Sequence, residues 1–325
     1  MKLARRDLLG ATLSLPIARG AKGAQPPWPG ALVMGTGRAG GVFTVFGPAW
    51  GQLINSATGI SVAYRATGGS SANLLLIEEG SAQLGLTTVA VAAQARSGTG
   101  GWTAGVKLES FRALFPAYPS ILQIISTHTG ISSLLALDGQ EIGVGPDGAS
   151  GAAAIPAILA AIGVRPSRSV AGNYDQQVKA MLEGKLAACA FIGAPPLPAI
   201  SAAAIGRKLQ LIGFSLAQAA KAVKAVPGLS HMVLRANTFP GQNIDVGSVG
   251  TLNIAVGAAS LPDNLAEAVT MAALKHRKQL GTVVPAAAQT PQAQPVYAAG
   301  VSFHPGAAKA LREAGISLPG SAVQG

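Results

Sequence analysis

Beyond residue 24, short apolar runs alternate along the chain with longer amphipathic ones, and Gly, Pro or polar residues separate them. Short runs rich in Val, Ile and Leu are typical of buried strands, and the longer runs are typical of helices that cover a sheet. The short runs predict strands at residues 31–34, 60–64, 83–87, 121–126, 141–144, 186–191, 209–213, 231–234 and 251–256. The longer runs predict helices at residues 71–79, 150–162, 174–183, 262–276 and 306–314. This alternation indicates an α/β fold.

One helix-to-strand pattern occurs in two places. Residues 76–80 end a predicted helix with Gly and lead into the apolar run that finishes at Thr87, and residues 181–184 lead in the same way into the run 186–191. Gly commonly ends a helix because it adopts the left-handed conformation that follows the last turn. The two copies indicate two lobes that are built alike, although an α/β protein can contain this local pattern by chance.

Pro and Gly cluster at residues 115–119 and 226–228, where the chain would cross between the lobes. These crossings predict a first lobe made of residues 25–121 and 235–325, and a second lobe made of residues 122–234. The second lobe would then be inserted between the two halves of the first.

The composition of the 325-residue chain supports a folded protein with a large core, because 49% of its residues are hydrophobic and only 11% are charged. No run of about 18 apolar residues follows the N-terminal segment, so no membrane span is expected. The single cysteine, Cys189, excludes an intrachain disulfide and lies in an apolar run, where we expect it to be a small buried hydrophobe.

Residues 1–24 have the pattern of an export signal, with a basic start, a weakly apolar stretch at 8–17 and small residues after it. The pair Arg5-Arg6 resembles a twin-arginine signal, which carries folded proteins across the bacterial inner membrane; a chance pair in an ordinary amphipathic terminus is the alternative. The segment contains no Cys to which a lipid could be attached. We therefore expect the signal to be removed and the mature protein to be soluble in the periplasm.

The net charge of +11 falls to +7 without this segment, whose five basic residues are offset only by Asp7. A basic balance suits an anionic ligand. Nucleic acid is not expected as a partner, because the Lys and Arg residues are dispersed and few aromatic side chains lie among them for base stacking.

Three glycine-rich turns each stand between a predicted strand and a helix start: residues 35–41 (GTGRAGG), 67–71 (TGGSS) and 145–151 (GPDGASG). Such turns expose backbone N–H groups and the positive end of a helix, and they bind the oxygens of phosphate or carboxylate without a basic side chain. Arg38 and Arg65 stand beside the first two turns and could either pair with a carboxylate or remain solvated at the rim.

The first turn also contains the spacing G-x-G-x-x-G of dinucleotide-binding folds. That fold places an acidic residue about 20 positions further on, at the end of the second strand, where this chain has Tyr64-Arg65-Ala66. Arg65 could instead meet a 2′-phosphate, so an exported NADP-dependent oxidoreductase remains an alternative. Gly47-Pro48 argues against it, because a helix that meets these residues within a turn of its start fits poorly with the tight packing of helix and strand in that fold.

Other catalytic or metal chemistry is not indicated. The four histidines show no metal-ligand spacing, and residues 148–151 lack the second spacer of a G-x-S-x-G nucleophile turn. His304-Pro305-Gly306 is more typical of a helix start than of a catalytic base. We therefore expect no catalytic residue, no metal site and no cofactor.

A series of short segments resembles the TAXI family of solute-binding receptors, the extracytoplasmic components of TRAP-type (tripartite ATP-independent periplasmic) transporters. The segments are GTGRAGGVF at 35–43, ATGGSSAN at 66–73, RALF at 112–115, GISSL at 130–134, DGQEIGVG at 138–145, HPGA at 304–307 and REAG at 312–315. Each is modest alone, but their order and spacing cover most of the mature chain.

This resemblance implies a two-lobed, type II periplasmic-binding-protein-like fold whose lobes close on a small organic anion. Ligands of the family include glutamate, glutamine and 2-oxo dicarboxylates, which the receptor delivers to a membrane permease driven by an ion gradient. It implies no catalysis, and we expect a monomer. The residues expected to bind the ligand are Thr36, Gly37, Arg38, Gly40, Gly41, Phe43, Thr67, Gly68, Gly69, Ser70, Thr88, Gly148, Ser150 and Phe191.

The chain departs from the family at several expected ligand positions. Phe43-Thr44 stands where two aromatic residues, often Tyr-Tyr, are common, so a phenolic hydroxyl is lost; residues 88–90 and 193–195 are also less polar than their counterparts. We therefore expect a drier pocket, in which a mono- or dicarboxylate is favoured over glutamate, whose ammonium needs acceptors. The same fold could alternatively present its ligand to a periplasmic sensor rather than to a permease.

Overall fold

The computed structural model describes residues 28–207, 209–288 and 292–323, and the signal expected at residues 1–24 lies outside this part. Its strands are β1 (Ala31–Gly35), β2 (Ser61–Arg65), β3 (Leu84–Thr88), β4 (Phe111–Ser126), β5 (Glu141–Gly143), β6 (Arg168–Val170), β7 (Ala188–Gly193), β8 (Gln210–Leu211), β9 (Leu229–Leu234) and β10 (Val246–Ala258). Its helices are α1 (Phe43–Thr58), α2 (Ser70–Glu78), α3 (Val89–Ser97), α4 (Ser150–Ala161), α5 (Tyr174–Leu182), α6 (Pro198–Ala204), α7 (Leu216–Ala225), α8 (Asp263–Lys275), α9 (Arg277–Val283), α10 (Gln294–Ala298) and α11 (Pro305–Glu313).

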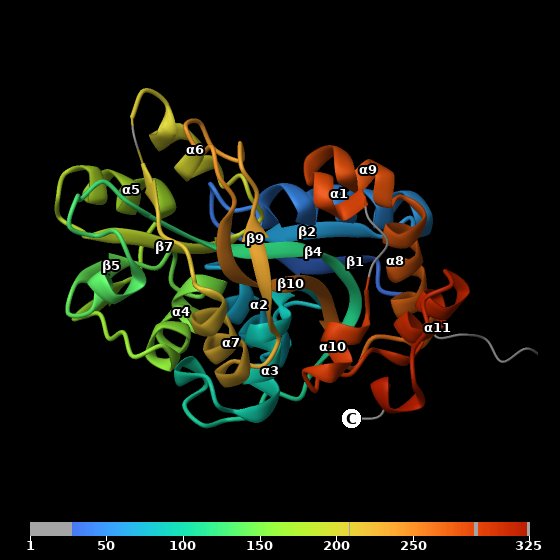
Figure 1. The fold of residues 1–325 in the computed structure, drawn as a ribbon. Coiled ribbons are helices and arrows are strands. Elements are labelled where there is room, and N and C mark those ends of the chain that lie inside the picture. Colours follow the sequence, from blue (N-terminus) through green and yellow to red (C-terminus); the bar gives the residue numbers. More distant parts are fainter. Residues whose placement is uncertain (1–27, 208, 289–291, 324–325) are drawn as a thin grey trace, which may run out of the picture.

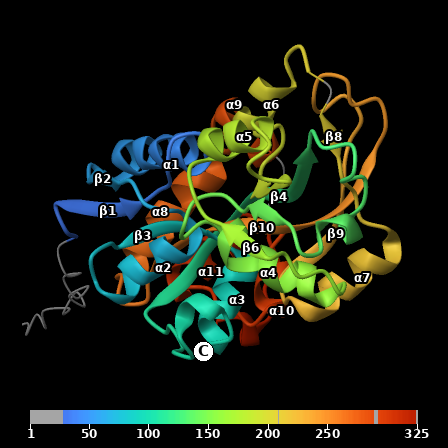
Figure 2. The same cartoon turned by 90° about the vertical axis from the view of Figure 1, so that its left-hand side faces the viewer.

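One mixed ten-stranded sheet runs through both lobes, with its main strands in the order β2-β1-β3-β10-β4-β7-β5-β6. Helices cover both faces: α1, α5, α6 and α9 lie on one side, and α2, α3, α4 and α7 lie on the other (Figures 1 and 2). The fold is therefore the two-lobed α/β fold that the sequence predicts.

Each lobe contains the same strand–helix–strand–helix–strand unit. In the first lobe β1 pairs in parallel with β2 and β3, and in the second lobe β5 pairs in parallel with β6 and β7. The pattern that occurs twice in the sequence falls on α2 and β3 in one unit and on α5 and β7 in the other. These positions are equivalent, so the sequence repeat marks two similar units.

The long strands β4 and β10 join the two units. They pair with each other antiparallel from Phe111 to Ile121, after which β4 pairs with β7 of the second lobe. β10 pairs with β9 through its first half and with β3 of the first lobe through its second half. Both strands therefore run from one lobe into the other, and the Pro-containing residues 115–119 lie in the middle of β4.

Aromatic packing anchors α1 on the core of the first lobe. Trp50 is fully buried, its indole ring meets Phe115 of β4 edge to face at 5.1 Å, and its Nε1 donates to the Val269 carbonyl of α8 at 3.0 Å. In the part of the chain that the structure describes, no helix is long and apolar enough to cross a bilayer.

The helix after the first turn is continuous across Gly47-Pro48, since α1 extends from Phe43 to Thr58. The proline ring removes one backbone donor, but Phe46, Trp50 and Ile54 on the same helix are fully buried. Tertiary packing of an apolar face outweighs a local helix breaker. Gly47 also has a packing role, since a Cβ there would lie 2.8 Å from the Thr36 methyl carbon.

His304 begins α11, as its sequence context predicts. Its Nδ1 accepts from the Gly306 N–H at 3.3 Å and its Nε2 lies 3.0 Å from the Leu261 carbonyl oxygen, so the ring is held as the neutral Nε2–H form. Burial lowers the pKa of this imidazole below its ordinary value. Cys189 is fully buried, which raises the pKa of its thiol to about 12 and confirms it as a core residue.

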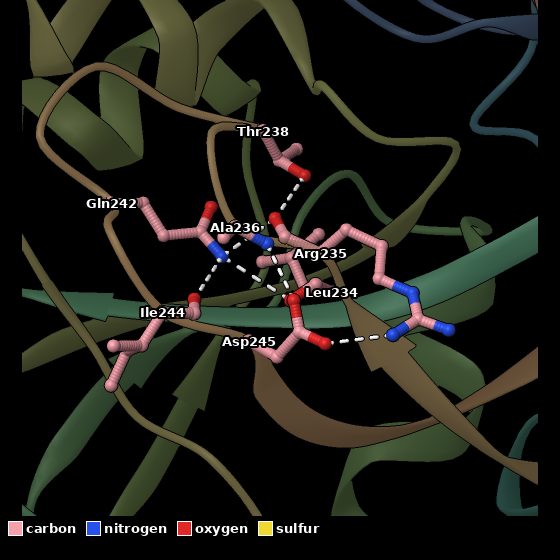
Figure 3. Close-up of polar contacts among 7 residues, drawn as sticks. All are labelled: Leu234, Arg235, Ala236, Thr238, Gln242, Ile244 and Asp245. Atoms are coloured by element: carbon pink, nitrogen blue, oxygen red, sulfur yellow. Dashed lines mark hydrogen bonds and ion pairs between the residues drawn. The ribbon is translucent and has the colours of Figure 1, made fainter.

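Polar contacts close the loop between β9 and β10 (Figure 3). The buried Gln242 donates through Nε2 to the carbonyls of Leu234, Arg235 and Ile244. Arg235 and Asp245 form an ion pair of 2.7 Å across the base of the loop. These contacts fix the long surface loop between the two strands.

Candidate ligand-binding site

A cavity lies between the lobes, at the carboxyl ends of β1, β2 and β5. The turns that follow these strands form its walls, and the middle of β4 and β10 forms its floor. Crevices at the carboxyl ends of strands are the usual ligand sites of open α/β sheets. Residues of both lobes line the cavity, so a ligand there would contact both.

The second and third glycine turns meet across the interlobe boundary. The hydroxyl oxygens of Ser70 and Ser150 lie 2.7 Å apart, and the Ser71 N–H donates to the Gly148 carbonyl at 3.0 Å. Gly68 lies so close to Asp147 that a Cβ at Gly68 would overlap the Asp147 carbonyl oxygen. Small residues in both turns are therefore required for this close approach.

Two helix N-termini meet at this contact, since α2 begins at Ser70 and α4 begins at Ser150. The residues that precede them, Gly69 and Ala149, make no side-chain cap. The first N–H groups of a helix have no partner within it, and the positive end of the helix dipole lies there. Without side-chain caps, these two ends suit the oxygens of an anion.

The first turn forms the opposite wall and is covered by the second lobe. Gly37, Gly41 and Phe43 line the cavity. The Tyr174 ring, at the start of α5, lies over this turn, within about 4 Å of where a Cβ on Gly40 or Gly41 would stand. Tyr174 also meets Phe191 of β7 edge to face at 5.0 Å, which fixes its ring over the glycines.

The cavity floor carries three polar residues of the strands that join the lobes: Tyr118 and Ser120 of β4, and Asn253 of β10. Asn253 donates through Nδ2 both to the Tyr118 carbonyl at 2.8 Å and to the Ser120 hydroxyl at 2.7 Å. These hydrogen bonds join the Asn253 side chain of β10 to β4 beneath the ligand space.

Among the described residues that line the cavity, Arg38 is the one charged side chain, and it is exposed at the mouth. None of these lining residues is Asp, Glu, His or Cys. Arg65 is also exposed, and its backbone carbonyl accepts from Thr36, but it does not line the cavity. The two helix ends and Arg38 thus give the described walls a positive character.

The structure brings the three predicted turns together around this cavity. The expected ligand residues that line it are Gly37, Arg38, Gly41, Phe43, Gly68, Gly69, Ser70 and Ser150. The others do not line it: Thr36, Gly40, Thr67, Thr88, Gly148 and Phe191.

These other residues support the lining. The Thr67 hydroxyl donates to the Thr36 carbonyl and accepts from the Gly69 N–H, which fixes the second turn against the first. Thr88 caps α3, because its hydroxyl accepts from the Val91 N–H.

Several lining residues are not among those expected from the sequence. Tyr118 lies in the Pro-containing run 115–119, which reads as a crossing between lobes, and Asn253 lies in an otherwise apolar strand. A polar residue in a buried strand is itself a signal, because such groups require a partner or a function. Tyr174 lies at an expected helix start, but nothing local places it over the first turn.

The cavity contains phenolic hydroxyls even though Phe43-Thr44 supplies none. Tyr118 and Tyr174 both line it, from positions remote in sequence. Ser70, Ser120 and Ser150 add further hydroxyl groups to the same lining. The physical reason is that the floor and the covering residue come from other parts of the chain than the glycine turns.

The strand order also bears on the nucleotide alternative. A dinucleotide-binding sheet has parallel strands in the order 3-2-1-4-5-6. Here β1 lies between β2 and β3, and the next strand, β10, is antiparallel. The G-x-G-x-x-G turn therefore belongs to a sheet whose strand order differs from that of dinucleotide-binding folds.

This two-lobed sheet with a cavity between the lobes is the fold of periplasmic solute-binding proteins. Similar solved structures include the alkanesulfonate-binding protein SsuA from Xanthomonas axonopodis pv. citri bound to MOPS, with a TM-score of 0.53, 13% identity, and coverage of 91% of this chain and 96% of that one. MatC from Rhodopseudomonas palustris with bound malate has a TM-score of 0.53 and 12% identity, covering 79% of this chain and 89% of that one. The periplasmic binding protein BugD has a TM-score of 0.52 and 14% identity, covering 88% and 98%.

Residues 34–315 match the NMT1-like family, and the chain belongs to that family. The matched residues include all three glycine turns and both strands that join the lobes.

Proposed function

We propose that this protein is an exported, periplasmic solute-binding receptor, and not an enzyme, that holds a small organic carboxylate between its lobes. The observation that carries this proposal is the meeting of the N-termini of α2 and α4 at Ser70 and Ser150, inside a cavity whose described lining contains no acidic side chain. Anions are favoured at such ends, and no carboxylate of the described lining opposes them.

A carboxylate suits this site better than an amino acid does. An ammonium group needs acceptors, and a buried cation without a counter-charge is costly. The cavity offers hydroxyls, backbone N–H groups and Arg38, all of which can donate to oxygen. Charge-assisted hydrogen bonds to a carboxylate gain strength when lobe closure excludes water, and micromolar binding needs only about 8 kcal/mol.

Malate and MOPS, bound by two of the similar structures, each carry an anionic group (carboxylate and sulfonate, respectively), which supports an anionic group in the ligand here. The segments that resemble the TAXI family support delivery of the ligand to a TRAP-type permease driven by an ion gradient. The basic segment around Arg5-Arg6 supports twin-arginine export. In this proposal residues 25–121 with 235–325 form one lobe and residues 122–234 form the other, and the glycine turns supply the ligand contacts.

A thermal-shift screen of carboxylates, with titration calorimetry on the hits, tests the proposal. A ligand present at about a hundred times its dissociation constant should raise the free energy of unfolding by about 2.7 kcal/mol. Neutral sugars and amines serve as controls of similar size. Stabilisation by sugars or amines, with none by any organic anion, would falsify the assignment.

A further inference from the structure

Tyr118 lies in the cavity floor with its side chain almost fully buried. It borders the interlobe cavity together with Ser120, and it also borders a separate hollow together with Ala117 and Pro119. Its ring packs edge to face against Phe46 of α1, with the ring centroids 5.0 Å apart.

The phenolic oxygen of Tyr118 is buried and has no hydrogen-bond partner among the described residues, although the residue is only 1% exposed. Its neighbours on the floor are already engaged: Asn253 uses Nδ2 for the Tyr118 carbonyl and the Ser120 hydroxyl. Buried polar groups are nearly always paired in native structures, and an exception requires an explanation. A ligand atom in the cavity would supply the missing partner.

The chemistry of that partner follows from the phenol. Burial raises the pKa of Tyr118 well above its ordinary value, and the neighbouring Tyr174 raises it further, so the group stays protonated. A neutral phenol donates one hydrogen bond and can also accept one. The partner is therefore an oxygen acceptor such as a carbonyl or hydroxyl, because an apolar carbon would leave the phenol unpaired.

We propose that Tyr118 is the specificity-determining residue of this site and donates to a second oxygen of the ligand. The site would then select carboxylates that carry a hydroxyl or keto oxygen over the corresponding acids without it. This inference rests on the proposed carboxylate-binding function and deepens it. The helix ends at Ser70 and Ser150 bind the carboxylate in this arrangement, and Tyr118 recognises the other oxygen from the cavity floor.

The test compares acids that differ at one position. Lactate and pyruvate are measured against propionate and alanine, and malate against succinate and aspartate, by titration calorimetry with the mature protein and with Tyr118→Phe. The wild-type protein should bind the oxygenated acid of the preferred chain length about tenfold more tightly than its deoxy counterpart. Tyr118→Phe should bind the two equally, through loss of affinity for the oxygenated acid alone.

The unliganded variant supplies a second readout. Because Tyr118→Phe removes a hydroxyl that is buried without a partner, it should melt at or above the temperature of the wild-type protein. Tyr64→Phe is the matched control, since Tyr64 is 43% exposed on β2 and does not line the cavity; it should leave the ratio of affinities unchanged.

Three outcomes would count against these ideas in different ways. An equal loss of affinity for oxygenated and deoxy acids in Tyr118→Phe would overturn the role of Tyr118 while leaving carboxylate binding intact. A wild-type protein that does not distinguish the two kinds of acid would overturn the inferred selectivity in the same way. Failure of every acid to bind the wild-type protein would overturn the proposed function, and this inference with it.

Discussion

Ser70 and Ser150, which lie 80 residues apart in sequence, bring their hydroxyl oxygens to 2.7 Å at the point where the first turns of α2 and α4 meet. Ser70 belongs to the first lobe and begins the helix that follows β2. Ser150 belongs to the second lobe and begins the helix that follows β5. The contact therefore joins the two lobes and brings two helix N-termini toward one small volume.

Gly68→Ala should prevent this arrangement. An added methyl group would overlap the Asp147 carbonyl, and backbone atoms in two rigid turns cannot move aside cheaply. We expect an intact fold that no longer closes, measured as a larger radius of gyration by small-angle scattering and as loss of the ligand-induced rise in melting temperature.

Gly130→Ala is the control for this change, because a Cβ at Gly130 has no neighbour within 4 Å. It should keep both the compact shape and the ligand response. If Gly68→Ala also keeps both, the closed contact between the two turns does not govern binding.

Arg38→Gln should slow ligand association rather than speed dissociation. The side chain is exposed at the cavity mouth, where a charge raises the encounter rate with an anion but contributes little once the ligand is enclosed. We expect a fall in the association rate of about threefold at low salt that disappears at high salt. Stopped-flow measurement checks this, with Arg65→Gln as the control for a charge outside the cavity. An increase in the dissociation rate alone would contradict a steering role.

Protonation of His304 should destabilise the fold. Burial lowers the folded-state pKa of this imidazole, whereas Asp263 and the Leu261 carbonyl raise it only in part. The unfolded chain therefore binds the proton first, so the free energy of unfolding falls as the pH drops below about 6.5 and levels off below the folded-state pKa.

Urea unfolding across this pH range, with His304→Asn, checks the assignment. Asn retains a cap for the Gly306 N–H but does not titrate, so the variant should be less stable at neutral pH and less sensitive to acid. His231→Asn, at an exposed position of β9, should leave the slope unchanged. An unchanged slope in His304→Asn would assign the acid sensitivity to another group.

Gln242→Ala should loosen the loop between β9 and β10. The substitution leaves the carbonyls of Leu234, Arg235 and Ile244 without this donor, at a cost of about 1–3 kcal/mol. Hydrogen exchange should quicken at the amides of Ala236 and Asn237, while Asn243→Ala, at the exposed neighbour, should not change it. Exchange that stays slow in Gln242→Ala would show that the Arg235–Asp245 pair alone fixes the loop.

The sequence predicts the sheet well, because short apolar runs bounded by Gly and Pro are a local signal. The strand β6 is absent from that prediction, since it has only three residues at an edge of the sheet. The helix α1 is absent from the predicted helices, and Trp50 anchors it through contacts with Phe115 and Val269. These partners lie far away in the chain, so no local pattern reveals them.

The candidate site also has one part that the sequence predicts and one part that it does not. The glycine turns are predictable, because a Gly-rich strand-to-helix turn has the same anion-binding chemistry wherever it occurs. The floor is not, because Asn253 and Tyr118 lie 135 residues apart and meet only when β4 and β10 pair. Tyr174 is also not predictable as a site residue, because it begins α5 in the second lobe but contacts Gly40 and Gly41 of the first lobe.

The strands β4 and β10 have one more consequence, which concerns folding rather than binding. Each supplies hydrogen bonds to the sheets of both lobes, so neither lobe cut from the chain would keep a complete set of strand partners. Loss of pairing in one half removes support from the other half along the same backbone. Heat should therefore unfold the two lobes in a single cooperative transition, and a destabilising change in either lobe should lower the one melting temperature that they share.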